Sequence, residues 1–198
     1  MYNGLQKYIP ANSFDYLETL LRREKVSLQI KAPRNSKWGD YRSPYGGTGH
    51  RISINSNLNE YAFLITLCHE IAHLLVWNTY RNKVKPHGKE WQLAFQAIMK
   101  PLFTNQVFPK ELNQQLLQHM KLPKASASAD INLLRILKSF DKEKALTLEN
   151  IPEGERFVLS NGHPFIKGIL RRKRYICVSL KNGKNYLIHP LASIQQMS

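Results

Sequence analysis

Cysteine is scarce in this chain of 198 residues, which contains only Cys68 and Cys177. Two isolated cysteines give no disulfide framework, so a small fold held together by several disulfides is excluded. Each cysteine lies in an apolar stretch, and we expect both to pack as small hydrophobic side chains.

Long hydrophobic runs are also missing. No stretch approaches the roughly 18 consecutive apolar residues of a membrane span. Residues 2–7 are mixed and polar, unlike the apolar core of a secretory signal. We therefore expect a cytoplasmic protein without a membrane partner.

Acidic residues are few, because 14 Asp and Glu stand against 29 Lys and Arg, for a formal net charge of +15. Such an excess predicts a polyanionic partner, with nucleic acid first and an anionic membrane surface second. The simpler interpretation is a soluble protein that happens to be basic. Both stay open, since net charge bears on association and not on fold.

Residues 62–77 form the most apolar stretch and are hydrophobic around the whole circumference of a helix. Asn57, followed by Glu60, resembles a capping box at the start of this helix. The stretch contains His69-Glu70-Ile71-Ala72-His73. Two imidazoles four residues apart lie on one helical face and can bind the same zinc ion. Glu70 beside them can take a proton from water, so we predict a zinc site with Glu70 as the catalytic base.

A catalytic zinc site needs a third protein ligand. Residues 86–91, Pro-His-Gly-Lys-Glu-Trp, open a second amphipathic helix that we expect to end at Pro101. His87 lies at the start of this helix, and Glu90 lies one turn further on. Both side-chain types are normal zinc ligands, so spacing alone favours His87 but leaves Glu90 as an alternative.

These two motifs together resemble the SprT-like metalloprotease family, which includes the Spartan protease of DNA–protein crosslinks. The resemblance covers about residues 10–103, including Trp38-Gly39-Asp40-Tyr41-Arg42 and the strand at residues 51–55. It implies that His69, His73 and His87 hold one zinc ion (Zn2+), and that the protein is a peptidase of DNA-attached proteins. By analogy with such peptidases, the strand at residues 50–55 is our candidate for an edge strand that pairs with substrate.

The chain departs from the family at its C-terminal end. Many SprT-like proteins end in a zinc ribbon with two Cys-x-x-Cys pairs, and this chain has none. A second, structural zinc ion is therefore not expected.

Hydrophobic periodicity predicts an α+β fold with helices packed on a small sheet, and the resemblance implies that this is a zincin-like metallopeptidase core. A helix is expected at residues 14–21, with strands at 26–31, 38–42 and 51–55. We assign residues 1–122 to the SprT-like core and residues 123–150 to a linker with a short helix. Residues 151–198 then form a small basic β-rich module, because Asn161-Gly162 and Asn182-Gly183 mark hairpins.

The β-rich module carries 8 Lys or Arg and 2 acidic residues. Basic side chains can follow phosphates while aromatic side chains stack on bases. The candidate nucleic-acid contacts are Lys167, Arg171, Arg172, Lys173 and Arg174. An ordinary solvated hairpin, with its aromatic residues facing a core, explains the same pattern equally well.

The sequence thus favours a zinc-dependent metalloprotease with protein substrates that are bound or crosslinked to DNA. One alternative is a regulatory zinc peptidase that cleaves a specific repressor-like protein without DNA. Another is a DNA-binding protein whose structural zinc has Glu90 as a fourth ligand. The side chain that stabilises the oxyanion stays open among Tyr41, Arg42, Tyr45 and His50.

Overall fold

The computed structural model describes residues 2–34, 36–124 and 130–197. The chain forms two compact units, Met1–Lys142 and Glu143–Ser198, and each has a hydrophobic core of its own. Both contain strands, and helices cover the sheet of the first unit, so the predicted α+β class is confirmed. Much of the low-complexity linker, residues 125–129, lies outside the described residues.

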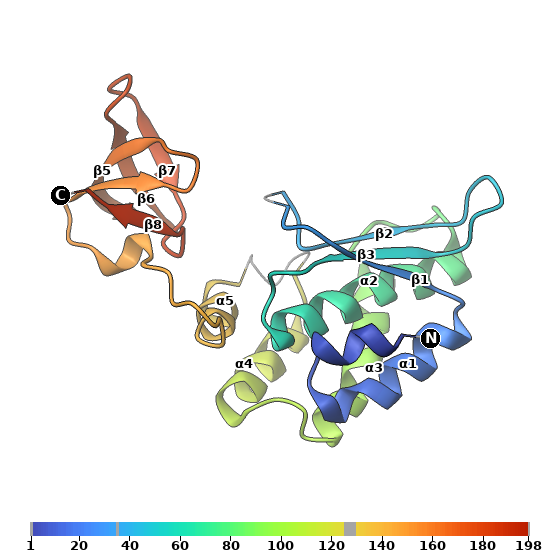
Figure 1. The fold of residues 1–198 in the computed structure, drawn as a ribbon. Coiled ribbons are helices and arrows are strands. Elements are labelled where there is room, and N and C mark those ends of the chain that lie inside the picture. The colour runs from blue at the N-terminus through green and yellow to red at the C-terminus, as the bar shows by residue number, and fades with distance from the viewer. Residues whose placement is uncertain (1, 35, 125–129, 198) are drawn as a thin grey trace. The chain divides into compact units, whose positions relative to one another are not determined.

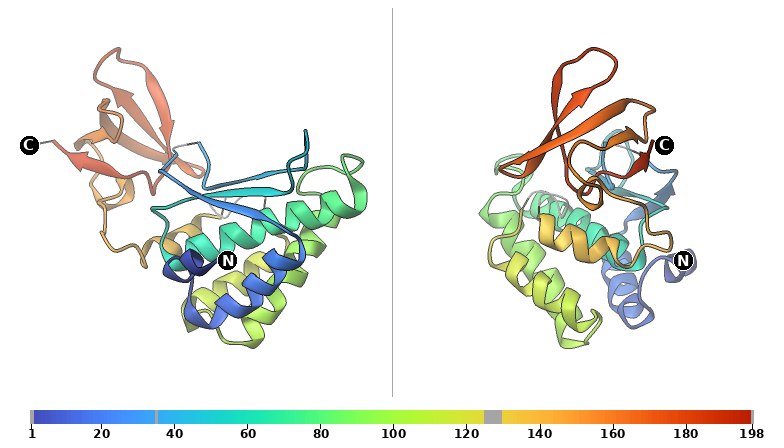
Figure 2. Two further views of the ribbon diagram at one scale, coloured as in Figure 1. Left: turned by 45° about the vertical axis from the view of Figure 1, so that its right-hand side comes forward. Right: turned by 90° about the vertical axis from the view of Figure 1, so that its left-hand side faces the viewer.

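The first unit packs helices against one face of a small sheet (Figures 1 and 2). Its elements are η1 (Asn3–Lys7), η2 (Ala11–Ser13), α1 (Phe14–Arg23), β1 (Ser27–Lys31), β2 (Gly39–Arg42), β3 (Arg51–Asn55), α2 (Glu60–Tyr80), α3 (Lys89–Thr104), α4 (Lys110–Lys121) and α5 (Ile131–Lys138). The apolar stripe expected near the N-terminus is the buried face of α1.

The three strands of the first unit run in the order β1-β3-β2, with β1 parallel and β2 antiparallel to β3. Strand β3 therefore has both sides of its main chain paired. The expectation that residues 50–55 form a substrate-binding edge is wrong, because a central strand has no free donors or acceptors to offer. The edge beside α2 is β2.

Helix α2 is the central helix of the first unit, and most of its side chains are buried. Its length and composition would allow it to cross a membrane, but 61% of that apolar window is buried inside the protein, as in the core helix of a soluble protein. Its N-cap is Asn59, whose side chain accepts from the Ala62 N–H at 2.9 Å, so the predicted capping box of Asn57 and Glu60 is wrong. The amide of Asn59 also donates to the carbonyl of Leu137 at 2.8 Å, which ties α2 to α5.

Two helices differ from the sequence-based expectation, α3 in its length and α5 in the unit to which it belongs. Helix α3 continues past Pro101 to Thr104, because proline removes one backbone donor but leaves the turn after it able to close through the Asn105 N–H and the Pro101 carbonyl. Helix α5, which the sequence analysis places in the linker region, buries Leu133 and Leu137 in the core of the first unit.

The second unit is an antiparallel sheet in the order β7-β6-β5-β4-β8. Its elements are η4 (Leu148–Asn150), β4 (Arg156–Leu159), β5 (Pro164–Arg171), β6 (Arg174–Ser179), β7 (Asn185–Ile188) and β8 (Ile194–Gln196). The two Asn-Gly pairs lie in the turns between β4 and β5 and between β6 and β7, as expected for hairpins. Cys68 and Cys177 are fully buried, one in each unit's core.

Candidate metal centre

His69, Glu70 and His73 lie on the central helix α2 and face different neighbours. Thr66, Glu70, His73 and Trp77 follow each other at helical spacing along the stripe that faces strand β2. His69 instead lies beside α3, where its ring is 4.6 Å from that of Trp91. The Nε2 atoms of His69 and His73 therefore approach each other from one helix, while the carboxyl group of Glu70 lies against strand β2.

His87 comes from the turn before α3, and its backbone is in the left-handed region, with φ of 58°. Such a conformation is uncommon for a residue with a side chain. The turn closes through the Gly88 N–H and the Lys85 carbonyl at 3.0 Å. A Cβ at Gly88 would lie 3.0 Å from that same carbonyl oxygen, so the tight turn that presents His87 favours glycine next to it.

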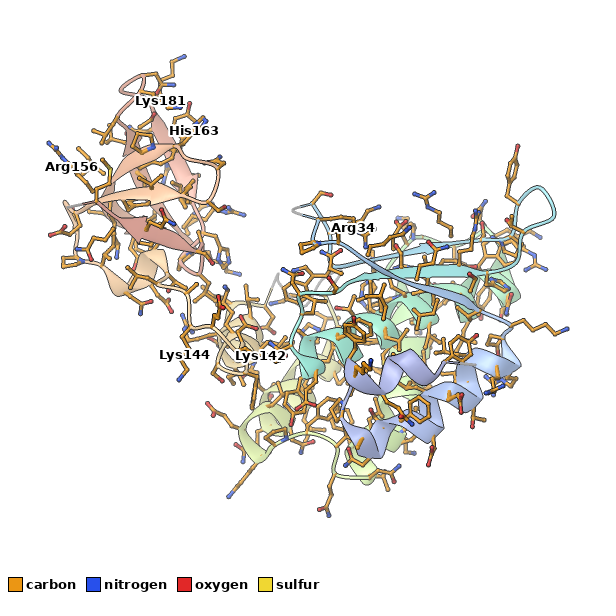
Figure 3. The ribbon with its side chains drawn as sticks, in the orientation of Figure 1. Arg34, Lys142, Lys144, Arg156, His163 and Lys181 are labelled. Atoms are coloured by element: carbon orange, nitrogen blue, oxygen red, sulfur yellow. The ribbon has the colours of Figure 1, made fainter. Side chains whose placement is uncertain are left out.

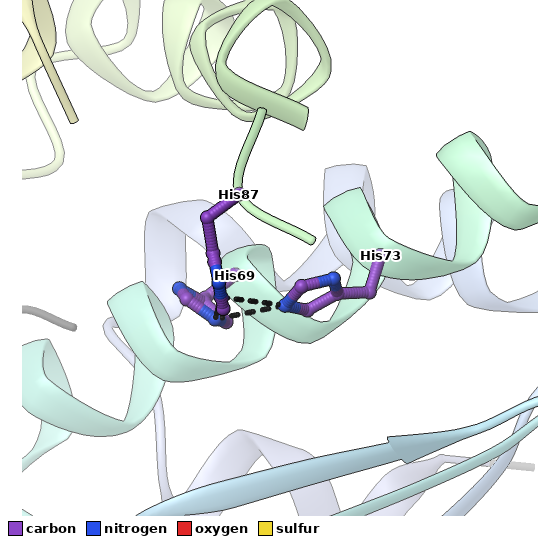
Figure 4. A group of neighbouring side chains, drawn as sticks. All are labelled: His69, His73 and His87. Carbon is purple, nitrogen blue, oxygen red and sulfur yellow. Dashed lines mark hydrogen bonds between the residues drawn. The ribbon is translucent and has the colours of Figure 1, made fainter. Parts of the chain in front are cut away.

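The three imidazoles meet at their Nε2 atoms, as Figure 4 shows. The distances are 2.9 Å between His73 and His87, and 3.1 Å from His69 to each of the other two. Within the described residues these three form the group of possible ligands close enough to share one metal ion. Glu90, the alternative third ligand, is not part of that group.

Burial keeps these imidazoles neutral. Together with the neighbouring histidines, it lowers the pKa of His69 to about 3 and that of His73 to about 4. Burial also lowers the pKa of His87. Neutral imidazole is the form that binds a metal ion, so at neutral pH the site is ready to receive one.

The spacing of the three nitrogens fits a tetrahedral metal ion. Zinc–nitrogen bonds of about 2.0–2.1 Å place two ligand nitrogens about 3.3 Å apart, close to the observed separations. A triangle of Nε2 atoms cannot be satisfied by mutual hydrogen bonds, because each Nε2 of a neutral ring carries either a proton or a lone pair and cannot both donate and accept. A cation at their centre would satisfy all three lone pairs.

Glu70 is buried, with 7% of its surface exposed. Burial raises the pKa of Glu70 to about 8, the charge of Asp40 adds to the rise, and a hydrogen bond from the Tyr41 main chain opposes it. Strand β2 lies directly against this carboxyl group, since a Cβ at Gly39 would be 2.7 Å from Glu70 Oε1. The strand therefore fixes where the carboxyl group can lie.

Trp91 supports the whole cluster, a role that its place on an amphipathic helix does not reveal. Its ring centre lies 4.6 Å from His69, 5.6 Å from His73 and 4.8 Å from His87, and it stacks on Phe95. Its indole N–H also donates to the His69 carbonyl at 3.4 Å. The signal in the sequence is the fixed distance of four residues between His87 and Trp91.

A cleft of about 480 Å3 opens beside the cluster, between the sheet edge and the loop after α2. Its lining includes His73, His87, Tyr41, Arg42, Trp77 and Arg81. The Tyr41 hydroxyl is 2.9 Å from His50 Nδ1, whereas Tyr45 is 84% exposed in the turn after β2. Among the four residues considered for the oxyanion, the structure thus brings Tyr41 and Arg42 to the cleft.

The predicted nucleic-acid contacts of the second unit separate into two groups. Arg171, Arg172, Lys173 and Arg174 are exposed at the turn between β5 and β6. Lys167 is only 5% exposed; its ammonium donates to the Ile151 carbonyl at 2.5 Å and lies over the Tyr175 ring. Lys167 therefore stabilises the core of this unit and is not available to a phosphate. Alternation along β5 explains why, because Lys167 shares the inner face with Phe165.

Fold and site together define an α+β protein with a three-histidine site that can hold a metal ion. The chain belongs to the SprT-like family, whose model matches residues 11–119. That range contains all three histidines and Glu70, and it ends before the second unit.

Individual relatives match over shorter segments. Protein SprT of Cronobacter sakazakii is 32% identical over 91 residues, which cover 42% of this chain and 54% of the relative. Protein SprT of Enterobacter sp. is 45% identical over 42 residues, covering 21% of this chain and 25% of the relative. The chain thus spans between a quarter and about half the length of these relatives. No solved structure matches the chain.

Proposed function

We propose that this protein is a zinc-dependent metallopeptidase with a zincin-like core, located in the cytoplasm and acting on proteins bound or crosslinked to DNA. The observation that carries the proposal is the triangle of Nε2 atoms beside a buried carboxyl group. Family membership and the high net positive charge support it.

In this proposal His69, His73 and His87 hold one zinc ion. The ion would supply Lewis acidity, polarising a peptide carbonyl and lowering the pKa of water in the site. Glu70 accepts a proton from the attacking water and passes it to the leaving nitrogen as the peptide bond breaks. Tyr41, a residue that lines the cleft, is the proposed donor to the oxygen that gains negative charge.

Strand β2 replaces β3 as the proposed substrate-binding edge. It is the edge strand beside α2, and Tyr41 and Arg42 on it also line the cleft. An extended substrate can add to such an edge by main-chain hydrogen bonds. The scissile bond would then run past the cluster of histidines.

The test is cleavage of a DNA-crosslinked protein by the full chain, with Glu70→Gln as the variant. We expect this variant to keep its zinc, measured by metal analysis, and to lose cleavage by about 10²–10⁴-fold, since it lacks the proton acceptor. Glu90→Gln is the matched control and should retain most of both metal and activity. Undiminished cleavage by Glu70→Gln would remove Glu70 from its role.

The same assay separates the alternatives. Free single- or double-stranded DNA should stimulate cleavage only if the enzyme works on DNA. Loss of zinc from Glu90→Gln, with no cleavage under any condition, would instead support a structural metal site.

A further inference from the structure

The sheet of the first unit has one face covered by helices and one open face that carries basic side chains. The open face holds a hollow of about 370 Å3. Its polar lining includes Gln29, Lys31, Arg34, Asp40, Arg42 and Arg51. Figure 3 labels Arg34 at the loop after β1, on the side of the sheet away from the helices. We call Lys31, Arg34, Arg42 and Arg51 the basic face.

Two of these arginines are direct neighbours on adjacent strands. Arg42 of β2 and Arg51 of β3 are register partners, so their side chains leave the same face opposite each other. Like charges in directly opposite positions destabilise a sheet. Asp40 offsets part of this repulsion, because its carboxylate accepts from Arg42 at 3.0 Å, so it is chiefly the charge of Arg51 that favours a further anion above the pair.

The hydrogen-bonding capacity of the basic face is incompletely used. Arg51 Nε is buried and finds no hydrogen-bond partner among the described residues. Arg34, by contrast, is fixed in place by bonds to Asn55 Oδ1 at 2.8 Å and Ser53 Oγ at 3.1 Å. One guanidinium is thus held by hydrogen bonds to β3, while the buried Nε–H of the other has no partner among the described residues.

Asp40 is the acidic residue in the lining of the hollow, and it is already engaged. Its carboxylate accepts from Lys37 at 2.8 Å and from Arg42 at 3.0 Å. Burial raises the pKa of Asp40, but these hydrogen bonds outweigh it and hold the pKa below its usual value. One carboxylate is shared by two cations, and among the described residues that line the hollow Lys31, Arg34 and Arg51 have no other carboxylate to pair with.

We propose that the basic face binds the phosphate backbone of a nucleic acid. Several cations spread over three adjacent strands suit a polymer with regularly repeated charges better than a single small anion. Ser53 and Gln29, which lie between the cations in the same hollow, add neutral polar groups of the kind that contact phosphate and sugar. No exposed large apolar side chain lines the hollow in the described part of the chain, so insertion into a membrane is not favoured.

Arg42 connects the basic face to the cleft beside the histidines. It lies at the edge strand β2 and lines both the hollow on the open face and the cleft. A nucleic acid on the basic face would therefore pass close to the edge proposed to hold the substrate. The inference deepens the DNA association in the proposed function and rests on it; it gives a route by which a protein attached to DNA reaches the cleft.

The test measures binding of a fluorescent oligonucleotide to the full chain by anisotropy, as single strand and as duplex, over a range of salt concentrations. The variant is Lys31→Gln/Arg42→Gln/Arg51→Gln, which leaves the structural Arg34 in place. The charge-matched control is Lys100→Gln/Lys110→Gln/Lys121→Gln, three exposed positions on or next to the remote helices α3 and α4.

We expect the basic-face variant to bind about 10- to 100-fold more weakly. The slope of log affinity against log salt should fall by about 2–3, because each phosphate contact contributes about 0.7–0.9. The control should change affinity by less than about threefold. The basic-face variant loses both the Arg42–Arg51 repulsion and the largely exposed Arg42–Asp40 ion pair, so its unfolding temperature should stay close to that of wild type, whereas a purely structural role would lower it clearly.

Three results would overturn the inference. The first is equal loss in both triple variants, which would mean that only net charge matters. The second is intact binding in the basic-face variant but loss when Arg171, Arg172 and Arg174 are changed to Gln. The third is competition by poly-glutamate as effective as by DNA of equal charge, which would assign the face to acidic polypeptides.

The proposed function can fail separately. The double variant Lys31→Gln/Arg51→Gln leaves the cleft residue Arg42 in place, and its cleavage of a DNA-free protein substrate should be unchanged. If the wild-type chain binds DNA through this face but cleaves nothing, the peptidase proposal falls and the inference stands. If the wild-type chain binds no nucleic acid, the inference and the DNA association fall together.

Discussion

Glu70 is a carboxyl group in surroundings that disfavour its charge. Its folded-state pKa of about 8 lies above the ordinary value of 4.5, with burial as the main cause. Between these two pH values the folded protein binds more protons at this residue than the unfolded chain does. The contribution of Glu70 to folding stability is therefore lost as pH rises from 4.5 to 8. A carboxylate with a raised pKa is a stronger base, and its burial lowers the folding stability of the metal-free protein.

Glu70→Gln should for this reason stabilise the metal-free protein, and increasingly so at higher pH. The gain over wild type is expected to be small at pH 5 and on the order of a few kcal/mol near pH 8.5, because glutamine stays neutral. Calorimetry of both metal-free proteins at the two pH values measures it. The depressed histidine pKa values cancel in the comparison, since both proteins carry them. An equal difference at both pH values would show that the carboxylate is not penalised by its surroundings.

The candidate site was predicted from sequence as far as residue types and spacing allow. The two histidines of α2 follow from helical geometry, and His87 follows from the motif with Gly88 and Trp91. The left-handed backbone of His87 could not be predicted, because only the assembled turn shows it. The contact of the Trp91 ring with all three imidazoles likewise depends on how α3 packs against α2.

At the scale of elements, the contact between β2 and α2 sets the geometry of the site. Gly39 lies over Thr66 and Glu70, and a Cβ there would be 2.7 Å from an atom of each. Two positions later, Tyr41 lines the cleft beside His73 and Trp77. Strand β2 thus runs alongside helix α2 and places its main chain against the carboxyl group of Glu70.

Gly39→Ala should impair catalysis without removing the metal. We expect kcat to fall by about 10- to 100-fold because the carboxyl group of Glu70 must move, while zinc affinity changes little. Gly49→Ala is the matched control, since its Cβ would be 3.8 Å from the nearest atom. Steady-state kinetics with metal analysis gives both readouts. Equal kcat in the two variants would contradict the assigned role of Gly39.

Local periodicity predicted most of the elements, but not their neighbours in space. The alternation in residues 26–31 and 51–55 identifies strands, yet it does not say that β3 lies between β1 and β2. The correct N-cap, Asn59, differs from the predicted Asn57 because its amide also bonds to the distant α5. Pairing order and long-range caps are tertiary properties, which explains these errors.

At the scale of the whole molecule, the two units have separate cores, and the family match covers only the first. The proposed ligands all lie in the first unit. A metal ion that binds the folded form alone stabilises the unit that contains its ligands. The other unit gains nothing from it.

Chelation should accordingly lower one of two thermal transitions. We expect the transition of the first unit to shift down by several degrees in a chelator, because an ion at 100 times its Kd contributes about 2.7 kcal/mol. The transition of the second unit should stay in place. Differential scanning calorimetry with and without chelator tests this. In the variant His87→Ala, which lacks one proposed ligand, chelator should not shift either transition. Movement of both transitions together would contradict independent cores.

The two cysteines of the chain lie in different hydrophobic cores. Each hydrophobic core holds one thiol, fully shielded from solvent, and burial raises the pKa of both Cys68 and Cys177. A buried thiol with little thiolate does not react with alkylating reagents until its surroundings open. The order in which an alkylating reagent modifies Cys68 and Cys177 therefore reveals which of the two units unfolds first.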